Sequence, residues 1–545
     1  MGALMRLRLP SIKIRARLLP WLLLVGLSLT SLQLTHGQGA DFRRYNEWAS
    51  VFARSDIFAL SGNVATPTGL PLTQWSFGPG LIIAFPDGLQ LPSLLGTSRL
   101  RIVGVVSFFL TWLGVLLLLP PKFKRSPFAI TASLLLIFYG SHAGFYSHHH
   151  SSESLSILLI VWLTVFLRDG DYGRHWKAAA FFTLGGLLCL CRLKLAPVAG
   201  LYFLVWAYRG RKVVDARHGW ADAAIALTLL LLVGAMIGTA NQWMTGSFFS
   251  SPYAVGDEGF RAAELLRPRF LSEVLFHPWH GLLVYHPLYA VGAGVLLLRL
   301  FQRRLRLEDG LGLIALVSLL YLHAGWFIWW LGTGSFGMRG LAPICLLLVL
   351  PVLDELAERR SHWLAWTLIP PVFWSFLLYE QGHTNFFTYA MLFQAQWQTW
   401  LNLTGELSYY SPIVIVPATL LLSRILVLSD TDPAGEDRLR SAMPYAAASF
   451  ALLFLVSSLL FARTAASTRE LMAQDAQWGR RNFRAVNNYN HEDFMRNLRG
   501  YQRVDGYEYE KESIRAFLER NPNIHYKAYL RDLHGARIYQ ARFGR

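Results

Sequence analysis

Ile102-Val-Gly-Val-Val-Ser-Phe-Phe-Leu-Thr-Trp-Leu-Gly-Val-Leu-Leu-Leu-Leu119 is a run of 18 residues without a charge, and Pro121-Lys-Phe-Lys-Arg125 follows it. A helix rises about 1.5 Å per residue, so this run matches the bilayer core of about 30 Å. The basic residues directly behind it are typical of a loop that stays on the cytoplasmic side. This stretch therefore predicts a membrane-spanning helix followed by an inside loop.

The same alternation of apolar blocks and short charged loops continues along the 545 residues. Hydrophobic residues make up 53% of the chain and charged residues only 16%, with a mean hydropathy of +0.33. Soluble domains carry roughly 25% charged residues. The composition therefore predicts an all-α polytopic membrane protein.

The net charge of +17 has a topological explanation. Many lysines and arginines lie in short loops on alternate sides of the apolar blocks, as the positive-inside rule describes. A nucleic-acid partner is therefore not expected. The three cysteines, Cys189, Cys191 and Cys345, lie in or beside apolar blocks and form neither a disulfide framework nor a zinc-ligand spacing.

We expect a bundle of about 13 transmembrane helices, since this count places every dense basic loop on one side. The basic N-terminus stays cytoplasmic, the first span is uncleaved, and the C-terminus lies outside. The expected spans are residues 18–34, 102–119, 128–145, 154–167, 178–191, 195–208, 221–240, 281–298, 310–328, 340–356, 362–379, 412–428 and 444–462.

This topology divides the chain into a transmembrane domain, residues 1–462, and a small soluble extracytoplasmic domain, residues 463–545. Residues 37–98 form a first outside loop, where mixed apolar and charged residues predict interfacial helices. Residues 241–280 form a second long outside loop. The expected location is the plasma membrane, with several passes through it.

Asp41 is the first candidate for chemistry, because it follows the first span on the outside. A carboxylate placed there can act as a general base toward a hydroxyl group, or can help to bind a divalent metal. The alternative is structural, since Asp at the start of the helical pattern that begins near residue 42 is a favoured N-cap.

Three basic residues are candidates for binding a phosphate. Arg192 and Lys194 occupy a tight outside turn between two spans, where a charge is costly without a partner. Arg339 lies in Gly337-Met-Arg-Gly340 at the outer end of the tenth span. Arginine binds phosphate bidentately. The alternatives are side chains that snorkel to lipid headgroups, and an interfacial belt of tryptophans with one stray arginine.

Histidines gather near the outer ends of the third and fourth spans. Consecutive histidines converge poorly on one metal ion, so we favour contact with a phosphate or sugar over metal binding. His277, His280 and His286 form a weaker group of the same kind. The outer group consists of His142, His148, His149 and His150.

The sequence contains no P-loop, no dinucleotide-binding glycine motif and no nucleotide-sugar domain. Four short segments do recur in one family: Ala40-Asp-Phe-Arg-Arg-Tyr45, Trp75-Ser-Phe-Gly-Pro-Gly-Leu81, Pro278-Trp-His-Gly-Leu-Leu-Val-Tyr-His-Pro287 and Trp330-Leu-Gly-Thr-Gly-Ser-Phe-Gly-Met-Arg339. With the topology, they resemble the GT-C superfamily of polytopic glycosyltransferases. The likeness is to the bacterial protein-mannosyltransferase-like and aminoarabinose-transferase-like branches, over residues 18–356.

The resemblance implies a GT-C-like fold and a polyprenyl-phosphate-linked sugar donor, with catalysis at the outer face. It further implies that the first-loop acidic residue, here Asp41, is the base. Basic residues near the outer span ends would hold the donor phosphate, and Arg192, Arg339 and Lys194 match that description. The acceptor is a glycan, lipid or protein. The expected substrate-binding residues are Tyr45, His148, His149, Tyr285 and Trp330.

The sequence departs from the family at one point. Many members have two adjacent acidic residues in the first loop, whereas Phe42 follows Asp41 here. We therefore expect that no cofactor is required, although a divalent metal stays possible. The alternative functions are a transporter or flippase for lipid-linked saccharides and a non-catalytic membrane protein of envelope assembly.

Overall fold

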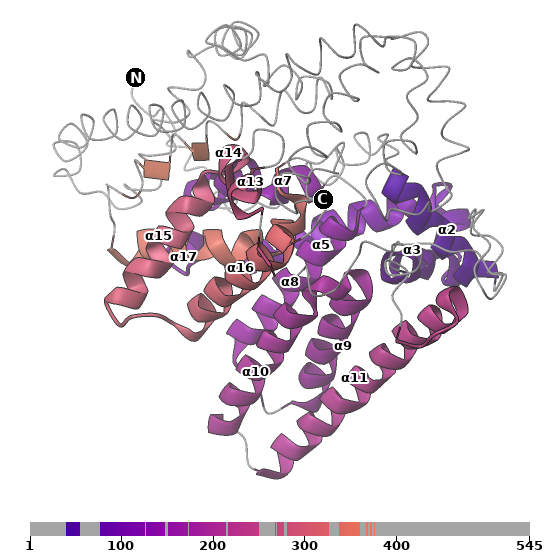
Figure 1. Ribbon diagram of the computed structural model, residues 1–545. Coiled ribbons are helices and arrows are strands. Elements are labelled where there is room, and N and C mark those ends of the chain that lie inside the picture. The colour runs from indigo at the N-terminus through magenta and orange to yellow at the C-terminus, as the bar shows by residue number, and fades with distance from the viewer. Residues whose placement is uncertain are drawn as a thin grey trace, which may run out of the picture.

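The structure is a computed structural model that describes residues 40–54, 77–125, 127–147, 151–172, 174–213, 216–249, 267–268, 270–276, 281–325 and 337–359, together with residues 364, 367, 368, 371, 372 and 375. Every regular element in these ranges is a helix, as predicted (Figure 1). Four helical stretches are long and apolar enough to cross a membrane: Arg99–Leu118, Trp220–Trp243, Leu307–Gly325 and Arg339–Glu358.

The first outside loop contributes short helices, as expected for its amphipathic sequence. They are α2 (Ala40–Arg54), α3 (Gly78–Gly88) and α4 (Leu91–Leu95). The face of α2 that carries Trp48 packs against Phe77, and α2 lies alongside α3 in Figure 1. All three helices lie within residues 37–98, the expected first outside loop.

The following helices form the larger part of the bundle. They are α5 (Arg99–Leu118), η2 (Phe123–Arg125), α6 (Pro127–Gly140), α7 (His142–Ser147), α8 (Ser152–Asp169), α9 (His175–Cys191), η3 (Leu193–Leu195), α10 (Ala196–Val213) and α11 (Ala216–Thr245). In Figure 1, α8, α9, α10 and α11 run side by side below α5, which agrees with the packing of α8 on α9 and of α9 on α11.

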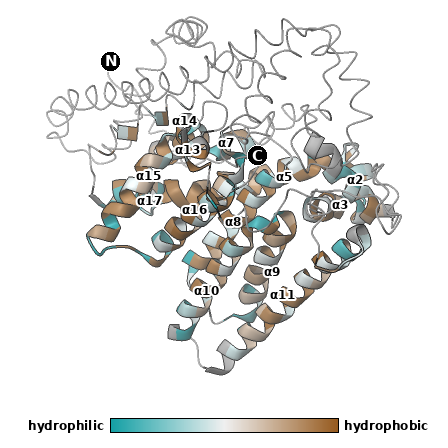
Figure 2. Ribbon diagram, viewed as in Figure 1, coloured by the Kyte–Doolittle hydropathy of each residue, from teal (hydrophilic) through white to brown (hydrophobic). Residues whose placement is uncertain are grey.

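A second group of helices packs beside the first. It comprises α13 (Leu271–Phe276), α14 (Leu282–Tyr285), α15 (Leu288–Phe301), α16 (Leu307–Gly325), η4 (Arg339–Ile344) and α17 (Cys345–Arg359). Brown, apolar residues cover most of these helices in Figure 2, and teal residues gather near their ends. That pattern is typical of helices that bury their length in an apolar medium.

Most predicted spans between residues 99 and 359 coincide with helices, but two are interrupted. The expected span 128–145 bends at Ser141, whose hydroxyl donates to the carbonyl of Ile137 over 2.6 Å and accepts from the amide of Ala143 over 3.2 Å. Such side-chain bonds compete with the helical ladder. The expected span 281–298 breaks before Pro287, which lacks an amide hydrogen.

Several expectations fall outside the described residues. These are the expected spans 18–34, 412–428 and 444–462, most of 362–379, and the C-terminal domain 463–545.

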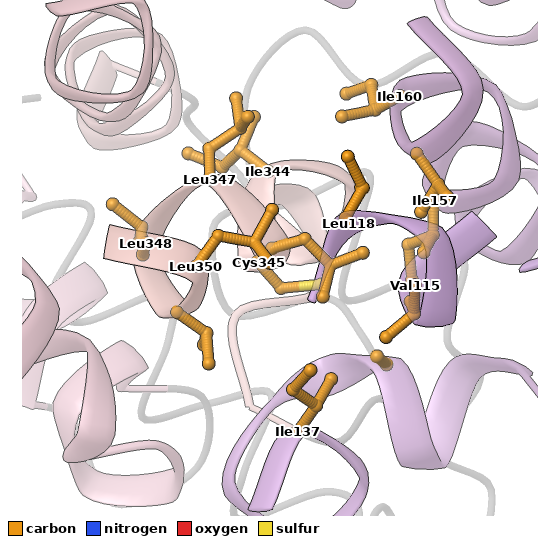
Figure 3. Packing of buried hydrophobic residues seen from close by; sticks show 14 of the residues in the cluster. Val115, Leu118, Ile137, Ile157, Ile160, Ile344, Cys345, Leu347, Leu348 and Leu350 are labelled. Atoms are coloured by element: carbon orange, nitrogen blue, oxygen red, sulfur yellow. The ribbon is translucent and has the colours of Figure 1, made fainter. Parts of the chain in front are cut away.

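The stretch Arg339–Glu358 is the most enclosed of the four candidate spans, because every residue of its apolar window is buried. Figure 3 shows Cys345 and the leucines of α17 packed among Val115 and Leu118 of α5, Ile137 of α6, and isoleucines of α8. A helix that is apolar on all sides is stable when other helices surround it. α17 is accordingly packed against α15, α16, α6 and α7.

The basic loops that were predicted to share one side meet at one end of the bundle. Asp354 of α17 pairs with Arg168 over 2.9 Å and with Arg306 over 3.2 Å. Lys122 donates to the carbonyl of Ala357 over 2.8 Å. We call this end the ion-paired end. It joins the loops after α5, α8 and α15 to the last turns of α17.

Arg299 is the most buried member of the ion-paired end. Its Nε donates to Glu355 over 2.9 Å, and its Nη1 donates to both carboxylate oxygens of Asp309 over 3.0 and 3.1 Å. All three side chains are at most 5% exposed. One arginine thereby pairs with two buried carboxylates, from α16 and α17.

Arg299→Gln is expected to lower the free energy of unfolding by about 3–5 kcal/mol, because it leaves two buried carboxylates without their cation. The measurement is denaturant unfolding of the full-length protein in detergent, followed by its helical circular dichroism. The matched control is Arg304→Gln, whose partner Glu358 is 3.8 Å away and whose side chain is 47% exposed. That change should cost about 0–1 kcal/mol. Equal losses in both variants would contradict the role of burial.

Candidate functional site

A cluster of charged side chains lies at the end of the bundle opposite the ion-paired end. Glu153 opens α8 and Arg168 lies near the end of α8, so the two ends are separated by roughly 22 Å along this helix. Arg192, Arg339 and Lys194 surround the Glu153 carboxylate, and His323 lies near these three cations. The Glu153 cluster consists of Glu153, Arg192, Lys194, His323 and Arg339.

Local sequence explains why Glu153 is held at this place. Ser151 caps α8 through its hydroxyl, and Ser154 completes the capping box. Glu153 then lies in the first turn, where a carboxylate is favoured by the free amide groups and the helix dipole. The beginning of α8 therefore presents a fixed negative charge.

Two arginines from distant parts of the chain reach the same oxygen of this carboxylate. Arg192 Nη2 lies 2.6 Å from Glu153 Oε1, and Arg339 Nε lies 3.7 Å from it. Glu153 is 2% exposed and Arg192 9%, whereas Arg339 is 37% exposed. The cluster thus has a buried floor and a side that faces outward.

The turn between α9 and α10 positions Arg192. α9 ends at Cys191, and Arg192 adopts an extended backbone while its amide donates to the carbonyl of Leu188 over 3.0 Å. The short η3 helix follows and carries Lys194, which is half-buried. The predicted tight turn is therefore present, and it directs Arg192 into the bundle.

The charges of the cluster keep Glu153 ionised. Burial alone would raise the pKa of this carboxyl, but the guanidinium groups of Arg192 and then Arg339, with a smaller effect of Lys194, lower it to about 2. Glu153 is therefore a carboxylate at every physiological pH. It stands between cations that would otherwise repel one another.

A chain of hydroxyl groups connects Glu153 to helix α2. The hydroxyl of Tyr45 donates to Ser152 Oγ over 3.0 Å, and Ser152 Oγ donates to Glu153 Oε2 over 3.3 Å. Asp41 lies four residues, about one turn, before Tyr45 on α2. The helix that carries the predicted base is thereby joined to the cluster of predicted phosphate-binding residues.

Arg99 holds the middle of α2. Its guanidinium donates to the side chain of Asn46 over 2.9 Å and to Ser50 Oγ over 2.7 Å, and it pairs with Asp87 of α3 over 2.5 Å. One side chain at the start of α5 therefore binds both α2 and α3. The position of α2 depends on this contact.

The segment Gly337–Gly340 packs against His142 and His286 at one end and against His323 at the other. Gly337 has a positive φ of 64°, and a Cβ there would meet Tyr285, His142 and His286 at 3.0–3.2 Å. A Cβ on Gly340 would lie 1.9 Å from Cε1 of His323. Only glycine allows the backbone to come this close, and Arg339 is thereby brought to Glu153.

The first of these environments is a buried group of rings. His142 Nδ1 is hydrogen-bonded to the hydroxyl of Tyr289 over 2.8 Å, and the rings of His142 and His286 are centred 4.0 Å apart. Tyr285 is fully buried beside them. Among the residues that the structure describes, no three His, Cys, Asp or Glu side chains form a group suited to a metal ion.

The predicted site residues have different outcomes. Arg192, Lys194 and Arg339, predicted separately as phosphate-binding residues, come together around Glu153. Asp41 lies within the first turn of α2. Tyr45 and Tyr285, predicted to bind substrate, are buried at 5% and 0% exposure. His148, His149 and Trp330 lie outside the described residues.

Glu153 and His323 were not predicted from the sequence. Glu153 follows directly after the serines that end the histidine run, so its acidic side chain between an outside loop and an apolar span was a usable signal. His323 lies inside an apolar block and carries no such signal. Its ring lies against the backbone of Gly340, in the segment that follows α16 in the chain.

No protein-family model matches the chain, and no curated protein matches it either. Function is therefore argued from the geometry of the Glu153 cluster.

Gly340→Ala is expected to destabilise the protein by about 1–3 kcal/mol, because the new methyl group would overlap the buried ring of His323. Thermal unfolding in detergent measures the change. The matched control is Gly294→Ala on α15, where a Cβ meets nothing within 4 Å and alanine is the better helix former. The close approach would be refuted if Gly340→Ala were as stable as Gly294→Ala.

Arg99→Met is expected to speed amide hydrogen exchange in residues 40–54 by roughly 10- to 100-fold, since hydrogen bonds to a charged group contribute about 1.5–3 kcal/mol. Hydrogen–deuterium exchange with mass spectrometry measures this on the full-length protein. Arg101→Met, an exposed position two residues further on α5, should leave exchange unchanged. Unchanged exchange in Arg99→Met would show that α2 is held by other contacts.

Proposed function

We propose that this chain is an integral-membrane glycosyltransferase of the GT-C type. It moves a sugar from a polyprenyl-phosphate donor to an acceptor at the extracytoplasmic face. The observation that carries the proposal is the meeting of Arg192, Lys194 and Arg339 at one end of the bundle. That end is joined through Tyr45 to the helix that bears Asp41.

The charge arrangement supports a site for a leaving phosphate. Arg299 is bonded to two carboxylates, whereas two arginines and a lysine surround the single carboxylate of Glu153. Arg339 is the more exposed of the two arginines. A phosphate that approaches from the bilayer surface would meet Arg339 first, and guanidinium groups match phosphate geometry well.

Each proposed residue has one role in the transfer. Asp41 accepts the proton of the acceptor hydroxyl while that oxygen forms a bond to the anomeric carbon of the donor sugar. The bond from this carbon to the phosphate oxygen breaks on the opposite face, so the configuration inverts. The lipid phosphate leaves with the electron pair, and Arg192 and Arg339 stabilise its growing charge.

These roles require no cofactor, and a divalent metal would be an addition to them. The donor is a membrane lipid, so the site must open toward the bilayer. The acceptor is a glycan, a lipid or a protein.

The proposed membrane arrangement follows from the same geometry. The ion-paired end, with its basic loops, would lie in the cytoplasm, and the Glu153 cluster would face the outside. The remaining parts of the proposal are about 13 spans within residues 1–462, a soluble extracytoplasmic domain at residues 463–545, and a plasma-membrane location.

Asp41→Asn is expected to abolish sugar transfer while the protein still folds, because the amide cannot accept the proton. The assay supplies polyprenyl-phosphate hexoses and pentoses, together with candidate glycan, lipid and protein acceptors, to the full-length protein in nanodiscs and measures released polyprenyl phosphate. Glu47→Gln is the matched control, since it removes a carboxylate from a different face of α2. It should keep full activity.

Full activity in Asp41→Asn would exclude Asp41 as the base. If the unchanged protein released no lipid phosphate from any donor, the transferase itself would be excluded. Movement of the intact donor across the membrane without its cleavage would instead identify a transporter.

A further inference from the structure

Glu153 has no role in the transfer proposed above, although it is the most buried charge of the cluster. Its side chain is 2% exposed, and it lies behind Arg192 and Arg339 as seen from the exposed side of Arg339. A carboxylate in this position is too enclosed to meet a substrate. Its contacts are with the residues that would meet one.

We infer that Glu153 is the positioning residue of the site, which holds Arg192 and Arg339 together so that one anionic group can contact both. The inference rests on the proposed function for the identity of that anion, a lipid-linked phosphate. It assigns a role to a residue that is neither the proposed base nor one of the proposed phosphate-binding residues.

The first support is that the two arginines share one atom. Both guanidinium groups approach Glu153 Oε1, at 2.6 Å for Arg192 and 3.7 Å for Arg339. Two positive charges at such close range repel strongly in a medium of low dielectric constant. A negative charge between them removes this repulsion, and only then can the two side chains stay close.

The second support is that the other carboxylate oxygen has a separate partner. Glu153 Oε2 accepts from Ser152 Oγ over 3.3 Å, and Ser152 in turn accepts from Tyr45 over 3.0 Å. The plane of the carboxylate is thus set from α2, on the side away from the arginines. Glu153 therefore aligns the arginines relative to the helix that bears Asp41.

The third support comes from a comparison with the ion-paired end. Arg299 and Arg192 each leave one buried nitrogen, Nη2 and Nη1 respectively, without a hydrogen-bond partner in the described structure. Arg299, however, is bonded to two carboxylates that are enclosed with it, whereas Glu153 is shared with the partly exposed Arg339. The Glu153 arrangement thus leads from a buried carboxylate to a cation that solvent reaches, as the pairing of Asp354 with the partly exposed Arg306 also does.

The test compares Glu153→Gln with Glu355→Gln in the full-length protein. Both changes remove a carboxylate buried against an arginine, so both should lower stability. The probe is a polyprenyl phosphate added to protein in phosphatidylcholine nanodiscs, with Kd measured by native mass spectrometry. Glu153→Gln should weaken binding by about 10- to 100-fold, as is usual when a supporting side chain is lost. Glu355→Gln should leave Kd unchanged.

A conservative variant distinguishes the effect of the position of the Glu153 carboxylate from the effect of its charge. Glu153→Asp keeps the negative charge but withdraws it by about 1.5 Å, one carbon–carbon bond. Its Kd should lie between those of the unchanged protein and Glu153→Gln. In the transfer assay the same order should appear in KM for the donor.

Other outcomes would overturn the inference. Tighter binding by Glu153→Gln would show that the carboxylate competes with the ligand for the arginines. Equal loss of affinity in Glu355→Gln would show a general effect of stability.

If the unchanged protein binds no polyprenyl phosphate, the proposed function fails, and arginine modification by phenylglyoxal still tests Glu153. Glu153→Gln should then accelerate the modification of Arg192, and Glu355→Gln should not. Equal rates in all three proteins would refute the positioning role.

Discussion

A charge inside an apolar bundle needs a partner, and this requirement determines which helix ends meet. An ion that loses its water without a counter-ion costs several kcal/mol, more than most single contacts contribute. Asp309 and Glu355 therefore bring α16 and α17 to Arg299 at one end. Glu153 brings the α9–α10 turn and the start of η4 to α8 at the other. The apolar core fills the space between two sets of ion pairs.

The surroundings of Arg299 and of Glu153 differ in composition. Arg299 is enclosed by its two carboxylates, and this contact joins α16 to α17. At the Glu153 cluster the cations outnumber the carboxylate among the described members, and Arg339 extends toward solvent. The same physical rule thus produces an enclosed ion pair around Arg299 and a partly exposed one around Glu153.

The sequence predicted the helices of the described region and three residues of the Glu153 cluster. Both predictions depend only on the free-energy cost of placing one short segment in an apolar medium. An apolar run of about 18 residues must be a helix in lipid, and an arginine in a tight turn between two spans must have a partner. The partner itself could not be predicted. Tyr45 and Ser152 are 107 positions apart, and nothing in either segment says which helices are neighbours. The bend at Ser141 was also missed, since it depends on a hydroxyl bonding its own backbone.

The helices α11 and α17 are both apolar, but they differ in how far other helices bury them. Both are rich in leucine, yet Leu227, Leu230, Leu231 and Leu232 of α11 are exposed, whereas the leucines of α17 are enclosed by other helices. On α11 one aliphatic side chain can replace another with little effect, because lipid adapts to its shape. On α17 the same exchange must fit a fixed space. Substitutions should therefore accumulate freely on α11 during evolution, and slowly on α17.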